Sequence, residues 1–504
     1  MKEYDLIIIG TGAGLNLVNT ALSRGLEIAL IEQGKVGGTC LTRGCIPSKI
    51  LVYPADIIRE AEHAKKVGVN FKLEGINWSL ISKRMWNQIN HSIEMEQGLK
   101  QVPGLTFYHG IGEFTGEYTM HVKLNNGEYS EEFRGNKIVI ASGSRSFIPP
   151  IKGLEETGYI TNESFFGEKF PKKPYKSLII IGGGVIAAEF AHVFSSFGTK
   201  VTIVEMLPRL LTTEEPEISE FVEREFRKRM DVYTNYRAIS ASKSMKEKTV
   251  IIEHVKTGKQ IEVKGEEILV ATGRKSNADI LKVDKTGVKT DKRGWIITNE
   301  YLETNKENVW CIGDANGKYQ FRHKANYEAE ILSHNLFASK DDRHIVDYSS
   351  VPWAIFTHPQ VAHVGMTEQE ALNAGYKLFV AIHHYSEVAK GYAMGYETGD
   401  DDDGFVKLVV SANRTILGVH IVGPHAAILL QPFVYLMNAG FTCNISQVHE
   451  IDKIPKAKRA CPTAGSFIPI YRSQVIHPSL NEVTAWALGN LKPVNKTEIP
   501  HSHH

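Results

Sequence analysis

Two cysteines near the N-terminus carry the strongest chemical signal in the 504-residue sequence. Cys40 and Cys45 are separated by four residues, follow two glycines and precede Pro47-Ser48-Lys49. A helix is expected to begin here, and a helix N-terminus lowers the pKa of a thiol and favours the thiolate, which is the nucleophile in disulfide exchange. The spacing lets the two sulfur atoms meet across one turn. The segment therefore predicts a redox-active pair rather than two unrelated buried cysteines.

Two units of strand, glycine-rich turn, helix and strand are repeated along the chain, and each ends in a glutamate. Their turn positions are Gly10, Gly12, Gly14, Gly182, Gly184 and Ala187. In such a turn the backbone N–H groups at the helix start face a pyrophosphate, and an acid at the end of the next strand holds a ribose hydroxyl. Glu32 and Glu205 stand 22 and 23 residues after the first glycine of their units. The repeat predicts two bound dinucleotides.

Glu205 also predicts which nicotinamide cofactor the second unit binds. A carboxylate accepts hydrogen bonds from a ribose 2′-OH and repels a 2′-phosphate. Met206 and Leu207 follow it, so the first nearby cation is Arg209. We therefore expect NAD(H) rather than NADP(H).

The composition is that of an ordinary globular protein, with 42% hydrophobic and 23% charged residues and a net charge of +1. Such a balance gives no global attraction to nucleic acid or to an anionic membrane. No apolar stretch reaches the roughly 18 residues of a spanning helix, no signal peptide is recognisable, and five cysteines are not a secreted disulfide scaffold. We found no zinc-binding spacing, P-loop or nucleic-acid module. A cytoplasmic enzyme without a metal ion, nucleic-acid partner or membrane partner is expected.

These motifs resemble the flavin-dependent pyridine nucleotide–disulfide oxidoreductases, most closely their dihydrolipoamide dehydrogenase branch. The segment around Cys40 and Cys45 matches the redox-active disulfide of that family, and Gly313-Asp314 matches its second flavin motif. Residues 271–277 match a conserved turn of the family, apart from Ser276 in place of proline. Further similar segments, for flavin contact, dimerisation and the catalytic histidine, are 321–325, 351–368 and 477–482.

The resemblance implies an α/β fold with two nested Rossmann-like dinucleotide-binding domains and a C-terminal α+β dimerisation domain. The FAD-binding domain would be split into residues 1–150 and 278–347, on either side of an NAD-binding domain at 151–277. Residues 348–490 would form the dimerisation domain of a homodimer. The polar segment 491–504 is expected to be a flexible tail.

The resemblance also implies catalytic roles. Cys40 would exchange with the substrate sulfur, and Cys45 would lie against the flavin. His477, held by Glu482, would act as general base on the disulfide of the partner subunit. Lys49 and Glu189 would pair near the flavin N5. The implied cofactor-binding positions are Gly10, Gly12, Gly14, Glu32, Gly38, Thr39, Lys49, Ser142, Gly143, Asp314, His323 and Ala325 for FAD, and Gly182, Gly184, Ala187, Glu205 and Gly273 for NAD.

The leading function is oxidation of dihydrolipoamide to lipoamide with NAD+, on a small-molecule dithiol or on a carrier protein of a 2-oxoacid dehydrogenase complex. Val475 replaces the family's usual histidine two positions before His477, and the stretch 449–474 is an unusual basic insertion that contains Cys461. These departures leave open a reductase of a small disulfide, of the mycothione or glutathione type, and a mercuric reductase. A redox sensor without turnover is a further alternative, against which the predicted base His477 argues.

Overall fold

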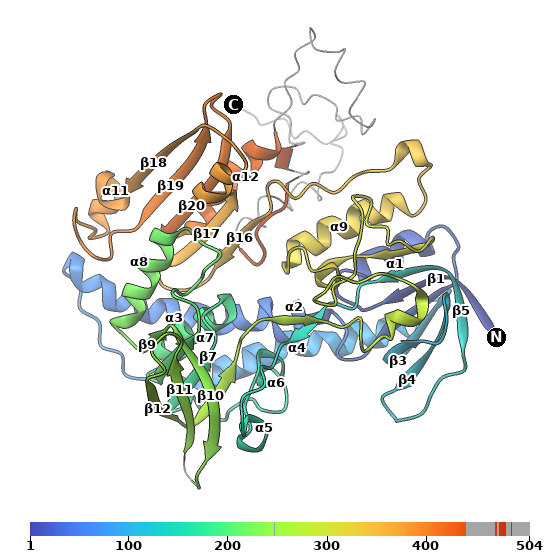
Figure 1. Ribbon diagram of the computed structural model, residues 1–504, viewed down its shortest axis with the longest axis horizontal. Helices are drawn as coiled ribbons and strands as arrows, with labels where there is room; N and C mark the ends of the chain where they lie inside the picture. The colour runs from blue at the N-terminus through green and yellow to red at the C-terminus, as the bar shows by residue number, and fades with distance from the viewer. Residues whose placement is uncertain (246, 440–468, 471–472, 480–484, 486–504) are drawn as a thin grey trace, which may run out of the picture.

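The computed structural model describes residues 1–504 except 246, 440–468, 471–472, 480–484 and 486–504 (Figure 1). The expected flexible tail, Glu482, Cys461 and most of the basic insertion lie outside the described residues. The described part is a mixed α/β structure with two mainly parallel sheets and a C-terminal antiparallel sheet. The α/β class expected from the sequence is confirmed. The expected domain boundaries remain predictions.

The first sheet is built around β1 (Lys2–Ile9), whose residues 6–9 are buried. Such a continuous apolar run suits a central parallel strand covered on both faces. Strand β1 lies between β2 (Ile28–Glu32) and β5 (Phe133–Ile140), both parallel to it. The other strands of this sheet are β3 (Leu105–Phe114), β4 (Thr119–Leu124) and β15 (Val309–Cys311). Because β15 pairs with β5, the chain returns to the first sheet after completing the second unit.

Helices cover this sheet and connect it to the second unit. Helix α1 (Leu15–Leu22) follows the first glycine turn and packs against α9 (Arg322–Asn335). Helix α3 (Cys45–His63) contacts both α4 (Trp78–Leu99) and α7 (Val185–Ser196). The remaining helices before α7 are α2 (Gly38–Arg43), α5 (Leu154–Thr157) and α6 (Asn162–Phe165). Helix α3 therefore carries residues of the first unit to the helix that follows the second glycine turn.

The second parallel sheet has the order β13-β7-β8-β9. Its strands are β7 (Ser177–Ile181), β8 (Lys200–Glu205), β9 (Asp231–Thr234) and β13 (Glu267–Val270). Helix α7 connects β7 to β8, and α8 (Pro216–Arg227) connects β8 to β9. An antiparallel sheet follows, made of β10 (Tyr236–Lys243), β11 (Lys248–His254) and β12 (Gln260–Gly265). The short strands β6 (Ser144–Ser146) and β14 (Arg274–Ser276) pair where the chain passes between the two units.

The third sheet is antiparallel, with the order β16-β17-β20-β19-β18, and lies above α8 in Figure 1. Its strands are β16 (Pro352–Ile355), β17 (Gln360–Gly365), β18 (Leu378–His384), β19 (Phe405–Ser411) and β20 (Ile416–Gly423). Helix α12 (Ala426–Asn438) packs against β16, β17 and β20. The other helices of this region are α10 (Glu368–Asn373) and α11 (Ala389–Ala393).

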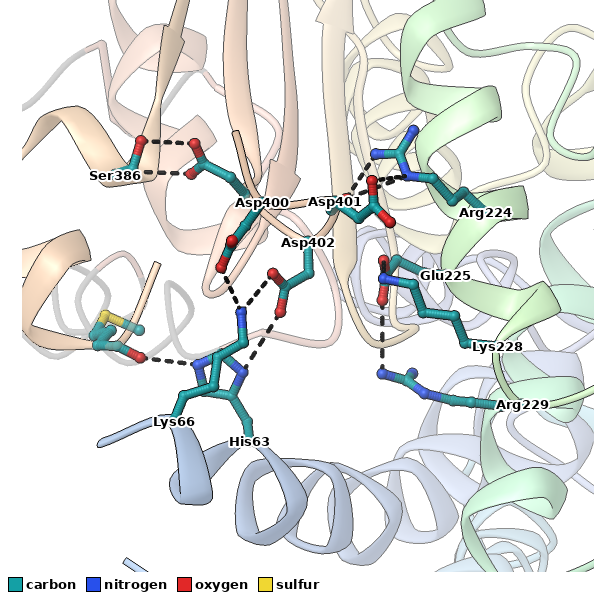
Figure 2. Close-up of polar contacts among 12 residues, drawn as sticks. His63, Lys66, Arg224, Glu225, Lys228, Arg229, Ser386, Asp400, Asp401 and Asp402 are labelled. Carbon is teal, nitrogen blue, oxygen red and sulfur yellow. Dashed lines mark hydrogen bonds and ion pairs between the residues drawn. The ribbon is translucent and has the colours of Figure 1, made fainter. Parts of the chain in front are cut away.

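The four aspartates 400–403, just before β19, connect the region of the third sheet to the other two units (Figure 2). Lys66, just beyond α3, donates hydrogen bonds to Asp400 and Asp402 at 2.9 and 2.7 Å. Arg224 of α8 donates to the backbone oxygen of Asp401 at 2.7 Å. The repulsion among the carboxylates is therefore offset by cations from both units. Within the described residues, none of the helices combines the length and apolar character needed to cross a membrane.

Candidate active site

The two N-terminal cysteines lie on different helices. Cys40 is in α2, Cys45 is the first residue of α3, and Gly44 separates the two helices. Both cysteines are thiols in this structure, and Cys40 is buried. One ligating atom each of Cys40, Cys45 and His477 lies within 4.8 Å of the others. The cysteine pair expected from the spacing is thus joined by the histidine expected from the C-terminal motif.

His477 contacts the first cysteine directly, with its Nε2 atom 3.1 Å from Sγ of Cys40. The segment that carries it is anchored on α12, because Ile476 is buried against that helix and donates its backbone N–H to Gln431 at 3.2 Å. Gln431 in turn donates to the backbone oxygen of Gln474 at 3.2 Å. The anchoring on α12 holds this histidine beside the cysteine pair of the described chain. Its action on the disulfide of a partner subunit, which the resemblance implied, stays a prediction.

The electrostatic surroundings of the two cysteines differ. The hydrogen bond from Cys40 lowers the pKa of Cys45 to about 6, and the charges of Lys49 and His477 act in the same direction. The same hydrogen bond, together with burial, raises the pKa of Cys40 above its usual value. In the reduced protein the negative charge therefore resides on Cys45, and Cys40 is the proton donor of the pair.

A lysine and a glutamate connect the two dinucleotide-binding units beside Cys45. Nζ of Lys49 donates to both carboxylate oxygens of Glu189 in α7, at 2.9 and 2.8 Å. Glu189 also accepts the backbone N–H of Phe356 at 3.1 Å. The Lys49 ammonium lies 4.5 Å from the ring centre of Phe356. The structure contains the predicted pairing of Lys49 with Glu189, and its role near a flavin stays a prediction.

A cavity of about 180 Å³ lies against the first glycine turn. Predicted residues that line it are Gly10, Gly12, Glu32, Gly38, Thr39, Ser142, Gly143, Asp314 and Ala325. The turn requires glycine, since a Cβ atom on Gly10 would lie 2.3 Å from the oxygen of Ala141, and one on Gly14 2.3 Å from the oxygen of Gly10. Glu32 holds the turn by accepting the backbone N–H and hydroxyl of Thr11, at 2.9 and 2.6 Å.

Ser142, in the wall of this cavity, has a buried polar atom that fits a bound ligand. Its Oγ has no hydrogen-bond partner among the described residues. Nδ1 of His323 has none either, but His323 is not among the residues that line the cavity, and its Nε2 lies 2.6 Å from the oxygen of Pro352. A buried group without a partner is costly unless a ligand or water satisfies it. The glycine turn and Oγ of Ser142 together suit a bound FAD.

A larger cavity of about 900 Å³ joins the second glycine turn to the redox cysteines. Predicted residues that line it are Cys45, Lys49, Gly182, Gly184, Glu189, Glu205, Gly273 and His477. Oε1 of Glu205 accepts the backbone N–H of Leu207 at 2.7 Å. Ala187 is fully buried in α7, where it packs in the core and does not line the cavity. A nicotinamide dinucleotide on the second turn would therefore share one cavity with Cys45.

Two arginines that the sequence analysis did not select line both cavities, namely Arg43 and Arg322. Arg43 lies between the two cysteines, and its buried Nε has no partner among the described residues. Arg322 begins α9, and its Nη1 would lie 3.8 Å from a Cβ atom on Gly12. Cations at these positions suit the phosphates of a dinucleotide. The sequence could have indicated both arginines, because Arg43 lies in the segment of the redox cysteines and Arg322 in the segment 321–325 that resembles a flavin-contacting stretch.

Comparison with known proteins agrees with this geometry. Residues 4–329 match the pyridine nucleotide-disulphide oxidoreductase family, and residues 351–464 match its dimerisation domain. The chain is 33% identical over 447 residues to mycothione reductase of Mycobacterium tuberculosis (strain H37Rv), covering 88% of this chain and 94% of that protein. It is 32% identical over 436 residues to dihydrolipoyl dehydrogenase of Bacillus subtilis (strain 168), covering 84% and 89%.

Other relatives have related chemistry. Mercuric reductase of Staphylococcus aureus is 30% identical over 444 residues, covering 87% of this chain and 78% of that protein. The HOCl-induced flavoprotein disulfide reductase RclA of Escherichia coli has a similar structure, with a TM-score of 0.70 and 26% identity, covering 90% and 100% of the two chains.

A cysteine pair between two dinucleotide cradles is the site of a flavoprotein disulfide oxidoreductase. The chain belongs to the pyridine nucleotide-disulphide oxidoreductase family, so the resemblance read from the sequence is confirmed. Members of this family use FAD together with NAD(H) or NADP(H). The C-terminal sheet and α12 belong to the dimerisation domain.

Proposed function

We propose that this protein is a cytoplasmic homodimer that oxidises dihydrolipoamide to lipoamide with NAD+. The observation that carries the proposal is the contact of 3.1 Å between Nε2 of His477 and Sγ of Cys40. A base at this distance can take up the proton of an incoming thiol or of Cys40 itself. The match to the dimerisation domain supports the homodimer.

The exchange uses only thiols, one disulfide and one base. In the oxidised enzyme Cys40 and Cys45 form a disulfide. His477 removes a proton from one substrate thiol, and the resulting thiolate attacks Sγ of Cys40, which breaks the Cys40–Cys45 bond and leaves Cys45 as the thiolate. The second substrate thiol releases its proton to solvent, and its thiolate attacks the first substrate sulfur. This step forms the cyclic substrate disulfide and releases Cys40, which is protonated by His477.

The environment of Cys45 suits its part in this sequence. A pKa of about 6 keeps its thiolate charged near neutral pH, so it is a good leaving group when the substrate attacks Cys40. A bound FAD would supply the redox chemistry that links the two cysteines to NAD+. The ion pair of Lys49 with Glu189 connects the two dinucleotide-binding units. Asp314 lines the flavin cavity and accepts a hydrogen bond from the hydroxyl of Ser144 at 2.8 Å.

The choice of NAD+ and of lipoamide rests on the lining of the larger cavity. Glu205 would accept hydrogen bonds from the ribose hydroxyls of NAD+ and repel the extra phosphate of NADP+. The lining of this cavity, which also contains His477, includes Phe321, Trp353, Phe356 and Pro478. These apolar groups suit a neutral aliphatic dithiol, free or on the lipoyl arm of a 2-oxoacid dehydrogenase carrier protein.

Reduction of a small disulfide is the second candidate. It is favoured by the identity of 33% to mycothione reductase and by Val475, where the lipoamide-oxidising branch usually has histidine. The same cysteine chemistry would then run in reverse, with NADH or NADPH as the electron donor.

A substrate panel tests both proposals. The purified flavoprotein is assayed with dihydrolipoamide and NAD+ or NADP+, and with mycothiol disulfide, glutathione disulfide and mercuric ion plus NADH or NADPH. We expect the highest kcat/KM for dihydrolipoamide with NAD+. A higher kcat/KM for any of the other acceptors would replace the lipoamide assignment. The variant Cys40→Ser should be inactive with every thiol and disulfide, whereas Cys311→Ser, at a buried cysteine of β15, serves as the matched control.

A further inference from the structure

A second group of possible metal ligands lies where the second unit meets the C-terminal sheet. His363 of β17 and His420 of β20 are directly opposite each other in the antiparallel pairing, with ring centres 4.1 Å apart. Glu214, just before α8, reaches them from the second unit. One ligating atom of each residue lies within 4.8 Å of the others. The exposed fraction of the three side chains is 1% or less.

Each of these residues directs an unsatisfied atom at the other two. Oε2 of Glu214, Nδ1 of His363 and Nδ1 of His420 are buried and have no hydrogen-bond partner among the described residues. Three such atoms in one buried site are unfavourable unless a common partner satisfies them.

The opposite side of each residue is held by a hydrogen bond that determines where the protons are. Nε2 of His363 lies 2.8 Å from the backbone oxygen of Gly365, and Nε2 of His420 lies 3.0 Å from that of Met366. A carbonyl oxygen only accepts, so each Nε2 carries a proton, and the neutral form of each ring presents its lone pair at Nδ1. Metal-binding histidines are typically oriented in this way.

The carboxylate is oriented similarly, since Nε1 of Trp353 donates to Oε1 of Glu214 at 2.7 Å and leaves Oε2 directed at the histidines. The site therefore offers two imidazole lone pairs and one carboxylate oxygen.

We propose that Glu214, His363 and His420 bind one divalent transition-metal ion, with zinc the best match. Zinc binds nitrogen and oxygen ligands at about 2.0–2.2 Å, so a tetrahedral ion separates neighbouring ligand atoms by about 3.4 Å. Oε2 of Glu214 and Nδ1 of His363 are 3.4 Å apart. Two histidines and one glutamate form a known zinc ligand set, which a water molecule completes. The ion would join the second unit to the dimerisation domain.

A neighbouring cluster of three glutamates differs from this site because a lysine already neutralises it. Glu215, Glu217 and Glu368 also lie close together, but Nζ of Lys407 is 3.0, 2.9 and 2.9 Å from their oxygens. The lysine already supplies the positive charge there. Among Glu214, His363 and His420 no described cation takes this place, which distinguishes the proposed metal site from its neighbour.

The decisive measurement is the metal content of the full-length flavoprotein, purified without metal-affinity chromatography. After loading with zinc chloride and dialysis against a weak chelator, inductively coupled plasma mass spectrometry should find about one zinc ion per chain. His363→Gln, His420→Gln and Glu214→Gln should each lower this occupancy at least tenfold. His383→Gln, at an exposed histidine of β18 in the same sheet, should retain the zinc. Far-UV circular dichroism and the flavin-to-protein ratio verify that the variants are folded.

A second measurement identifies the ligands and keeps Glu214, His363 and His420 unchanged. Cys40, Cys45 and His477 form another group that can bind a thiophilic ion. X-ray absorption at the zinc edge of the otherwise unchanged Cys40→Ser protein should show a shell of nitrogen and oxygen at about 2.0–2.2 Å without sulfur at about 2.3 Å. A wild-type protein with less than a tenth of a zinc ion per chain after loading, a sulfur shell, or full occupancy in all three folded ligand variants would overturn the proposal. These measurements use no thiol substrate, so they are independent of the proposed enzymatic function.

Discussion

Nε2 of His477 lies 3.1 Å from Sγ of Cys40, although the two residues are 437 positions apart in the chain. Cys40 belongs to the first dinucleotide-binding unit, and His477 follows the residues that match the dimerisation domain. The site therefore depends on the docking of these two regions. A disturbance of that docking would separate the base from the thiol without altering either residue.

The first prediction concerns the base. His477→Gln should lower kcat for dithiol oxidation by about 10²–10⁴-fold, because a positioned general base contributes about that much. Reduction of the bound flavin by NADH should proceed at a nearly unchanged rate, since it does not need this proton transfer. Steady-state assays give the first quantity and stopped-flow spectroscopy the second. A loss of less than tenfold would show that His477 is not the base.

The second prediction follows from the unequal cysteines. In the two-electron-reduced protein, the thiolate of Cys45 should give a charge-transfer absorbance with the flavin that increases with pH through about 6, because the deprotonated form predominates above the pKa. Cys40→Ala removes the hydrogen-bond donor that lowers this pKa, so the midpoint should move to higher pH. Cys45→Ser should abolish the band and leave flavin binding intact.

Spectrophotometric pH titration of the three proteins measures these midpoints, with Cys311→Ser as the control that should titrate like the wild type. A band that persists in Cys45→Ser would mean that Cys45 is not the sulfur beside the flavin. An unchanged midpoint in Cys40→Ala would show that the hydrogen bond from Cys40 does not control the pKa of Cys45.

The third prediction tests whether the base acts on the partner subunit. If His477 serves the partner's disulfide, as the resemblance implies, a mixed dimer of one Cys45→Ser chain and one His477→Ala chain should regain about half the wild-type activity, because one site carries both defects and the other carries neither. A base that acts within its own chain would leave one defect in each site, and no activity would return. Tandem affinity purification of differently tagged chains followed by activity assay distinguishes the two. A verified mixed dimer that is as inactive as either homodimer would contradict the shared site.

The fourth prediction concerns cofactor choice. Glu205→Ala should reduce the preference for NAD+ over NADP+, because it removes a carboxylate that would repel a 2′-phosphate at close range. The ratio of kcat/KM for the two cofactors measures the change. Glu217→Ala, at a glutamate outside the larger cavity, is the control for loss of one negative charge. A wild-type protein that already prefers NADP+ would contradict the assignment.

Local motifs made the family and much of the site predictable. Each glycine turn, at Gly10 and at Gly182, and the pair Cys40 and Cys45 is a motif of only a few consecutive residues. The spacing within each motif therefore indicates a dinucleotide-binding turn or a redox pair without knowledge of the fold. The pairing of Lys49 with Glu189 also followed from the resemblance, because both residues lie next to such motifs. Roles for these residues that depend on a bound flavin remain predictions.

Tertiary structure decided what depends on register and on the docking of distant segments. His363 and His420 meet because β17 pairs with β20 in one register, and Glu214 joins them because the second unit packs against that sheet. Arg322 reaches the first glycine turn because α9 returns to the first sheet with β15. His477 lies beside Cys40 because Ile476 anchors its segment on α12. None of these distances is set by local spacing, since strand pairing and packing of buried surfaces bring together residues far apart in the sequence.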